Sequence, residues 1–275
     1  MKQLLTYFSL SYFISWAIWL PLYGHHFGLS HLSSIPFQHA LGGLGPLLAS
    51  FLTTFIFLKK EGVKTLCKKC FQTKPVIYLL IALLSPFLLA ILAAIISYFV
   101  YGAPIKLSGL LINKEFPNFN LLTFFIYNLV LFGFGEEIGW RGFALPRLQL
   151  KFNALSSSIV LTVFWAAWHI PLFFYKSGFT SMGFTGIIGY IFSLLTGSIL
   201  LTWLYNSSRG SILICAIFHV TIDIAFTTDF ADKNIVSLMG MLITIWGILT
   251  IVIFKTKNLA TNERVKVLSA LQVNE

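Results

Sequence analysis

Five ionisable side chains that could perform chemistry together lie inside long apolar runs of this sequence. Three are acids, Glu136, Glu137 and Asp223, and two are histidines, His169 and His219. A charged group at the centre of a bilayer costs on the order of 2.5–3.5 kcal/mol, so such groups persist mainly where they have a function. The set therefore predicts a functional polar site inside a membrane.

The spacing of these residues predicts which of them meet. Glu136 and Glu137 are adjacent, so they point about 100° apart around a helix and do not lie on one face. Glu137 and Arg141 are four residues apart, the spacing of an ion pair on one face. We assign this pair a supporting role, which leaves Glu136 available for chemistry. His219 and Asp223 are also four residues apart, so one helix presents both along one stripe.

The depth of the polar groups in the bilayer follows from the helical rise of 1.5 Å per residue. Counted from the connections predicted to be cytoplasmic, Glu136 lies about 16 Å deep and His169 about 24 Å deep. His219 lies about 13 Å deep and Asp223 about 19 Å deep. Three predicted helices thus place their polar groups in one slab of the inner or middle bilayer, and we expect any cleavage near the cytoplasmic side.

Carboxylates and imidazoles that lie at a similar depth in the bilayer could together form a hydrolytic site. Glu136 suits general-base work on a water molecule, with His169 positioning that water or moving its proton. His219 with Asp223 could stabilise the oxyanion formed on a carbonyl. The same four side chains could alternatively hold a divalent metal ion such as zinc with one open position, because His and carboxylate are zinc ligands.

The composition places this chemistry in a membrane protein. Hydrophobic residues make up 57% of the 275 residues and charged residues only 10%, whereas a soluble domain carries about 25% charged residues. Lipid must therefore cover most of the chain, which excludes a cytosolic enzyme, a secreted disulfide scaffold and a disordered tail. The net charge of +10 lies mostly in short connections, which indicates membrane orientation and not a nucleic-acid partner.

Eight apolar stretches are long enough to be membrane-spanning helices, which need about 20 residues. They are continuously apolar and not alternating, so the sequence predicts an all-α polytopic bundle. Residues 1–254 form one transmembrane domain in this interpretation, and residues 255–275 form a cytoplasmic tail. The predicted spans are residues 4–23, 36–58, 76–101, 119–143, 154–175, 184–205, 211–228 and 234–254.

Lys and Arg residues gather in alternate connections. With both termini in the cytoplasm, 15 of the 19 lie inside and four outside, which supports an even number of spans. The outer four are Lys106, Lys114, Lys176 and Lys233. The inner fifteen are Lys2, Lys59, Lys60, Lys64, Lys68, Lys69, Lys74, Arg141, Arg147, Lys151, Arg209, Lys255, Lys257, Arg264 and Lys266.

Small residues recur inside the spans, where they permit close approach of two helices. We expect this role for Gly42, Gly43, Gly45, Gly133, Gly135, Gly186, Gly189 and Gly197. No internal repeat is evident, which weakens the interpretation as an inverted-repeat transporter.

Three motifs in order resemble a known family. Residues 136–141 read EEIGWR, the pattern EExxxR, and residues 165–169 read WAAWH, an aromatic residue four positions before a histidine. Residues 218–223 read FHVTID, the pattern HxxxN/D. Together, over about residues 119–226, they resemble the CAAX-protease and bacteriocin-processing (CPBP, or Abi) family of intramembrane endopeptidases.

The resemblance implies a glutamate or metallo-endopeptidase acting on a peptide or protein substrate at the bilayer. By resemblance, Glu136 activates the water and His169 is its partner, while His219 and Asp223 stabilise the oxyanion. Prenyl-protein endopeptidases of the family carry Asn where this chain has Asp223. An ionised Asp cannot donate a hydrogen bond and is better suited to bind a metal ion. The sequence therefore leaves open both a metal-free site and a site that holds a divalent metal such as zinc.

The same departure points toward the bacterial branch of the family, and so to a bacterial cell membrane. Two substrate classes are open, a CAAX-type peptide and a bacteriocin leader. Two other functions also remain open: a non-proteolytic bacteriocin-immunity or scaffold protein of the same fold, and a proton-coupled transporter in which the buried acids relay protons.

Overall fold

The computed structural model describes residues 1–105, 109, 112–113, 116, 118–230 and 232–267. Two of the predicted outer lysines, Lys106 and Lys114, lie outside the described residues, as does the end of the predicted tail at 268–275.

Helices form nearly all of the regular structure in this part of the chain, which confirms the all-α prediction. Its β-structure is a single isolated bridge between Asn113 and Thr228. The longest helices are α1 (Lys2–Tyr23), α3 (Gly45–Cys70), α4 (Val76–Tyr101), α11 (Phe184–Ser207) and α13 (Lys233–Asn258). Shorter ones are η1 (Gly24–Phe27), α2 (Gln38–Gly42), α8 (Ala154–Trp168), α9 (Leu172–Tyr175), α10 (Ser177–Thr180) and α12 (Ile212–Thr227).

Seven helical segments of the described chain are long and apolar enough to cross a membrane, and they coincide with seven of the eight predicted spans. The remaining predicted span, residues 211–228, forms α12, which has only 16 residues. Its length of about 24 Å falls short of a hydrocarbon core of about 30 Å. Most of α12 is buried among other helices, so protein and not lipid surrounds it and the bilayer thickness does not dictate its length.

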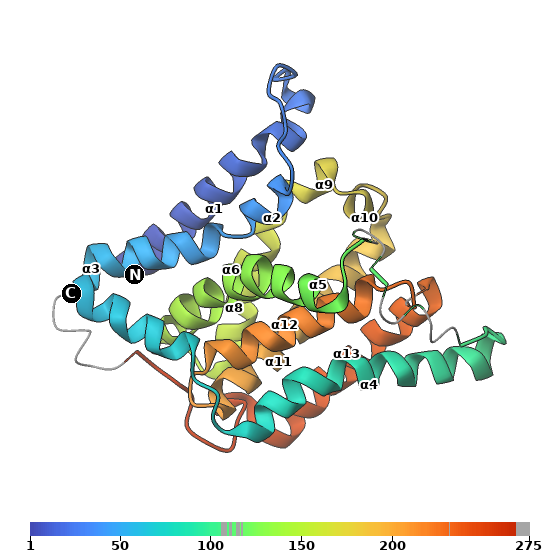
Figure 1. Cartoon of the computed structure of the whole chain (residues 1–275). Coiled ribbons are helices and arrows are strands. Elements are labelled where there is room, and N and C mark those ends of the chain that lie inside the picture. The colour runs from blue at the N-terminus through green and yellow to red at the C-terminus, as the bar shows by residue number, and fades with distance from the viewer. Residues whose placement is uncertain (106–108, 110–111, 114–115, 117, 231, 268–275) are drawn as a thin grey trace.

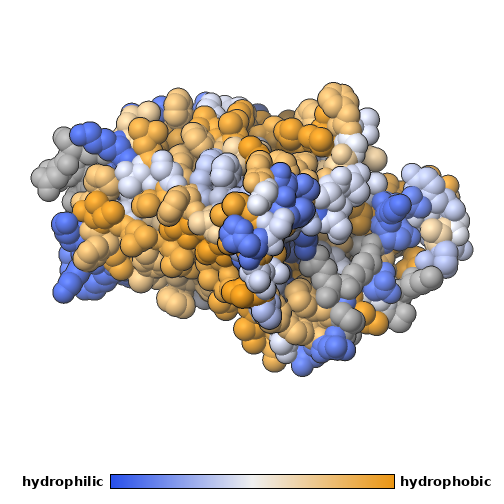
Figure 2. Space-filling view, turned by 90° about the horizontal axis from the view of Figure 1, so that it is seen from above, coloured by the Kyte–Doolittle hydropathy of each residue, from blue (hydrophilic) through white to orange (hydrophobic). Residues whose placement is uncertain are grey.

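The helices pack in layers around α12 (Figure 1). On one side α12 packs against α4, which in turn packs against α13. On the other side it contacts the segment Leu129–Phe134, and α1 packs along α3 beyond that segment. Apolar residues cover most of the visible surface, and hydrophilic residues gather at the two ends of the view and in one patch near its middle (Figure 2). This is the distribution expected of a bundle surrounded by lipid.

The fourth predicted span is not one regular α-helix. Two π-helical segments flank three α-helical residues within it. Such i→i+5 turns are rare and occur mostly at functional sites, so this span has an unusual backbone where the two glutamates lie. Its parts are α5 (Leu121–Asn128), η3 (Leu129–Phe134), α6 (Gly135–Glu137), η4 (Ile138–Ala144) and α7 (Leu145–Leu148).

Glycines allow this irregular segment to lie between α3 and α12. A Cβ added at Gly133 would lie 2.8 Å from Cγ2 of Val220 on α12, and one added at Gly135 would lie 2.8 Å from the carbonyl oxygen of Gly43. Both distances are too short for a side chain, so close packing is confirmed at these positions. The prediction of close helix packing is wrong for Gly189 and Gly197 on α11, where an added Cβ would meet nothing within 4 Å.

The connections predicted to lie in the cytoplasm meet at one end of the bundle, here called the basic end. The side chain of Gln149, just after α7, exchanges hydrogen bonds of 3.0 and 2.8 Å with Asn206 near the end of α11. Its Nε2 also donates to the carbonyl oxygen of Val265 at 2.7 Å, past the end of α13. Nε2 of Gln72 donates to the carbonyl oxygen of Ser208 at 2.8 Å. The tail up to residue 267 therefore packs on the bundle.

Helix α3 bends where its predicted span ends. Lys59 has φ 53° and ψ −154°, which are non-helical values. The helix continues beyond the bend to Cys70, and Figure 1 shows the change of direction. Of the three free cysteines in the chain, Cys67 in this second part is exposed, while Cys70 and Cys215 are buried.

The accessibility of Cys67 tests which side of the membrane the basic end faces. A membrane-impermeant maleimide should label Cys67 in inside-out vesicles and not in intact cells, because the predicted basic end is cytoplasmic. Cys67→Ser should remove the signal. In that background Ser33→Cys, at an exposed position beyond η1, should be labelled in intact cells. The reverse pattern would show that the bundle is inverted.

Candidate active site

Glu136 lies on α6, between the two π-helical segments. Its side chain is almost completely buried, with 4% of the residue exposed. Its Oε2 accepts a hydrogen bond of 2.7 Å from the indole nitrogen of Trp165 on α8. The aromatic residue of the second motif therefore holds the first glutamate in place, a role that the spacing of the motif did not indicate.

Glu137 forms the most buried polar contact of the site. It is fully buried, and its Oε1 accepts a hydrogen bond of 2.9 Å from Arg141, which confirms the predicted pair. The same oxygen accepts a second hydrogen bond of 2.8 Å from Nδ1 of His219. The Arg141 guanidinium also lies over the Trp165 ring, 4.6 Å from its centroid. Glu137 thus joins its own segment to α12.

Arg141 does not lie at the cytoplasmic surface, where its charge was counted. Its side chain is 0% exposed and is held inside the bundle by Glu137. One of the fifteen inner cationic residues therefore balances a buried acid and has no part in orienting the protein. The other connections still carry the predicted excess of Lys and Arg.

His169 ends α8 and turns its ring into the site. Its Nδ1 lies 2.8 Å from the carbonyl oxygen of Trp165. Because a carbonyl only accepts, Nδ1 carries the hydrogen, and in the neutral ring Nε2 is an acceptor. Trp168 packs edge-on against the ring, with centroids 4.8 Å apart. The histidine therefore has a fixed tautomer and orientation.

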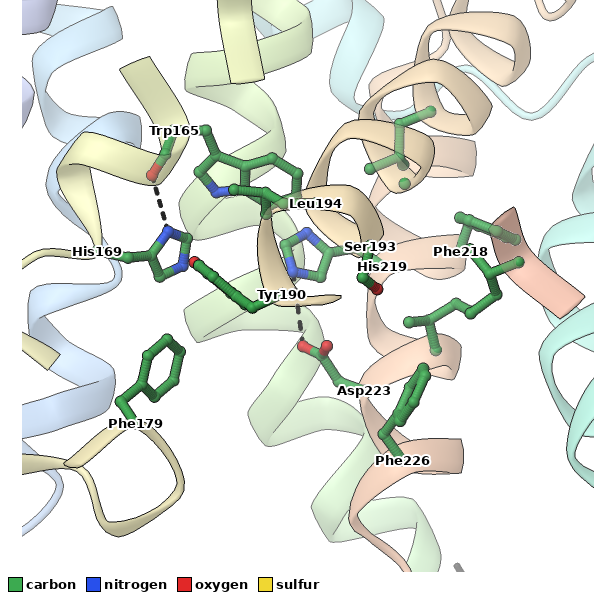
Figure 3. A pocket seen from close by; sticks show the side chains of 14 residues that line it. Trp165, His169, Phe179, Tyr190, Ser193, Leu194, Phe218, His219, Asp223 and Phe226 are labelled. Atoms are coloured by element: carbon green, nitrogen blue, oxygen red, sulfur yellow. Dashed lines mark hydrogen bonds and ion pairs between the residues drawn. The ribbon is translucent and has the colours of Figure 1, made fainter. Parts of the chain in front are cut away.

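His219 and Asp223 lie on α12 as one stripe, as predicted. Nε2 of His219 lies 3.5 Å from Oδ2 of Asp223, and the aspartate side chain is 38% exposed against 10% for the histidine. Figure 3 shows this pair facing His169 across the pocket. With Nδ1 on Glu137 and Nε2 beside Asp223, the ring is flanked by carboxylates at both nitrogens.

Two cavities meet at these residues. The larger, of about 550 Å³, is lined by all four predicted site residues, Glu136, His169, His219 and Asp223, and extends to α2; we name it the α2 cavity. The smaller, of about 320 Å³, is lined by His169, His219 and Asp223 and extends along α11; we name it the α11 cavity. The side chains predicted to act together thus converge on common space.

The α2 cavity extends to the end of the molecule opposite the basic end. Its lining includes Lys176, which belongs to a connection predicted to lie outside the cell, and Pro36, Phe37 and Thr227, which lie at the predicted outer ends of two spans. The expectation that cleavage takes place near the cytoplasmic side stays a prediction. The labelling of Cys67 tests which side of the membrane this end of the cavity faces.

The donor atoms do not converge in the way a metal ion requires. Within the described ranges, no group of three or more His, Cys, Asp or Glu side chains is placed to hold a metal. Nδ1 of His169 is directed at a backbone carbonyl, and both nitrogens of His219 face carboxylates. The arrangement of these side chains does not fit the zinc site that the sequence left open.

The fold and the site define a multi-pass helical membrane protein with buried acids and histidines around internal cavities. Residues 118–225 match the family model described as type II CAAX prenyl endopeptidase Rce1-like, which confirms the resemblance predicted from the three motifs. The chain is also 28% identical over 237 residues to CAAX prenyl protease 2 of Methanococcus maripaludis, covering 79% of this chain and 82% of the relative. The prediction of a bacterial membrane is not tested by this likeness.

The contact between Glu137 and Arg141 predicts a large effect on stability. Glu137→Gln leaves a guanidinium buried without its counter-charge, which costs about 3–5 kcal/mol. We expect a clearly lower midpoint of thermal unfolding for the purified protein in detergent. Glu61→Gln, at an exposed position of α3, is the matched control and should change stability by less than about 0.5 kcal/mol. Equal midpoints for the two variants would show that the buried pair does not stabilise the bundle.

Proposed function

We propose that this protein is an intramembrane endopeptidase that hydrolyses a peptide bond of a membrane-associated substrate. The observation that carries the proposal is the common lining of the α2 cavity by Glu136, His169, His219 and Asp223. They come from three separate segments and are held by contacts that orient each side chain. The likeness of residues 118–225 to an endopeptidase family supports the same reaction class.

Glu136 is the general base in the proposed mechanism. Trp165 holds its Oε2, and its carboxylate takes a proton from a water molecule in the cavity. Nε2 of His169 accepts a hydrogen bond from the second O–H of that water, which stays intact, because its Nδ1 is committed to a backbone carbonyl. The oxygen of the water then attacks the carbonyl carbon of the substrate. When the C–N bond breaks, Glu136 returns the proton to the leaving amine.

His219 stabilises the negative charge that develops on the carbonyl oxygen. Glu137 holds Nδ1 at 2.8 Å and so fixes the plane of the ring. In the doubly protonated form, Nε2–H is available to the oxyanion, and the carboxylates of Glu137 and Asp223 balance the charge of the ring. The supporting acid of the EExxxR motif thus acts on the reaction through His219.

The α11 cavity supports a substrate that carries an apolar group. Apart from the site residues, its lining is mainly aromatic and aliphatic, including Phe179, Phe218, Phe226, Leu201 and Ile243. We propose that it takes the lipid chain of a prenylated CAAX-type peptide, the substrate in the names of the family and of the relative. Apolar residues of a bacteriocin leader are the second candidate for the same space.

Glu136→Gln tests the proposed reaction. In lipid vesicles with a fluorescence-quenched farnesylated CAAX peptide, the rate should fall more than about 100-fold, because Gln cannot take a proton from water. The variant should insert normally, since Gln still accepts a hydrogen bond from Trp165. Glu61→Gln should cleave at the wild-type rate.

The outcome separates the alternative functions. Wild-type cleavage by Glu136→Gln contradicts the proposed mechanism. If wild-type protein cleaves neither prenylated peptides nor bacteriocin leaders while cells keep bacteriocin protection in the Glu136→Gln variant, the protein acts in immunity or as a scaffold. Solute flux in the same vesicles without any peptide cleavage indicates a transporter.

Chelation tests the chemistry of the site independently. Because the donors do not converge on one point, we expect cleavage to persist after treatment with EDTA and dialysis. Elemental analysis of wild-type protein and Glu136→Gln should show equal zinc content. Loss of activity on chelation, with recovery on adding zinc, would establish the metal-dependent reaction instead.

A further inference from the structure

The proposed site lacks a neutral donor to the oxyanion on the α12 side. The second residue of the His219 motif is Asp223, whose ionised carboxylate only accepts hydrogen bonds. Nε2 of His219 lies 3.5 Å from that carboxylate, so its N–H is shared between the carboxylate and the oxyanion. A tetrahedral intermediate needs preorganised donors aimed at its oxygen, so another O–H or N–H group at the cavity wall would complete the site.

Tyr190 on α11 presents such a group. Its hydroxyl is shielded from solvent and has no hydrogen-bond partner within the described part of the chain. A buried hydroxyl without a partner is costly, and in a native protein it calls for an explanation, such as strain, a bound water or a catalytic role. Tyr190 lines the α11 cavity together with His169, His219 and Asp223. In Figure 3 its ring extends between the two histidines, with the hydroxyl directed toward His169.

Aromatic neighbours hold the Tyr190 ring in this position. It meets Phe179 edge-on with centroids 5.2 Å apart and Phe173 with centroids 6.1 Å apart. The His169 ring is perpendicular to it, at a centroid distance of 6.1 Å. The ring is therefore fixed beside His169, the partner of the proposed base.

Another buried hydroxyl shows why location matters. The hydroxyl of Tyr7 on α1 also has no partner among the described residues. Its ring packs between Trp140 and Phe143 of η4, and it lines neither of the two cavities. Of these two tyrosines, Tyr190 is the one whose hydroxyl without a partner belongs to a residue in the wall of the site.

We propose that Tyr190 is a further catalytic residue, whose hydroxyl donates a hydrogen bond to the oxyanion of the tetrahedral intermediate. The inference rests on the proposed endopeptidase function. The proton stays on the tyrosine: the hydrogen bond strengthens as the carbonyl oxygen becomes negative and weakens when the C–N bond breaks. Tyr190 supplies the neutral donor that Asp223 in its ionised form does not.

Tyr190→Phe removes only the hydroxyl and keeps the packing of the ring. With the farnesylated reporter peptide, kcat should fall about 100-fold and KM should change less than about 3-fold, because the lost contact forms in the transition state. Tyr205→Phe is the matched control: its hydroxyl bonds Lys69 at the basic end, so kcat should stay at the wild-type value.

A second substitution separates catalysis from packing. Asp223→Asn introduces an amide N–H at the same place, so Tyr190→Phe in that background should lower kcat less than about 10-fold. Equal losses in both backgrounds, or less than about 3-fold loss from Tyr190→Phe alone, would overturn the inference while wild-type cleavage still upholds the proposed function. Absence of cleavage by wild-type protein would instead reject the proposed function, and the role of Tyr190 with it.

Discussion

The site depends on the two hydrogen bonds that the buried carboxylate of Glu137 accepts. One of its oxygens accepts hydrogen bonds from Arg141 and from His219, in a place with no access to solvent. A buried carboxylate is stable only with such partners, so the segment that bears the glutamates and α12 are held in one relative position. The Arg141 guanidinium extends this arrangement to the ring of Trp165, which in turn bonds Glu136.

The backbone around the glutamates is adapted to this network. Gly133 in η3 lets this segment lie against α12, and Gly135 in α6 lets it lie against Gly43. The π-helical segments η3 and η4 precede and follow α6. Helix α12 is too short for an ordinary span, but it is enclosed by the other helices. Buried polar groups and an irregular backbone are tolerated in a membrane where protein or an internal cavity surrounds them.

The cavities relate the network to a reaction. The α2 cavity gathers the acid and histidine side chains and extends to the end opposite the basic end. The α11 cavity adds apolar walls next to the same histidines. Both cavities are lined mainly by apolar side chains, and the acid and histidine side chains gather where the two cavities meet. Residues 118–225, which match the CAAX endopeptidase family model, contain all four of the proposed catalytic residues.

The sequence alone predicted the structural class of the protein and the side-chain pairs that lie within one helical segment. Composition and apolar runs predicted an all-helical membrane bundle, and four-residue spacing predicted the contacts of Glu137 with Arg141 and of His219 with Asp223. Only the tertiary structure decided that Glu137 holds His219, 82 residues away, that α12 is enclosed, and that the α2 cavity extends away from the basic end. Helical periodicity specifies neighbours on the same helix, whereas contacts between helices depend on how each helix is rotated and packed, which local patterns do not encode.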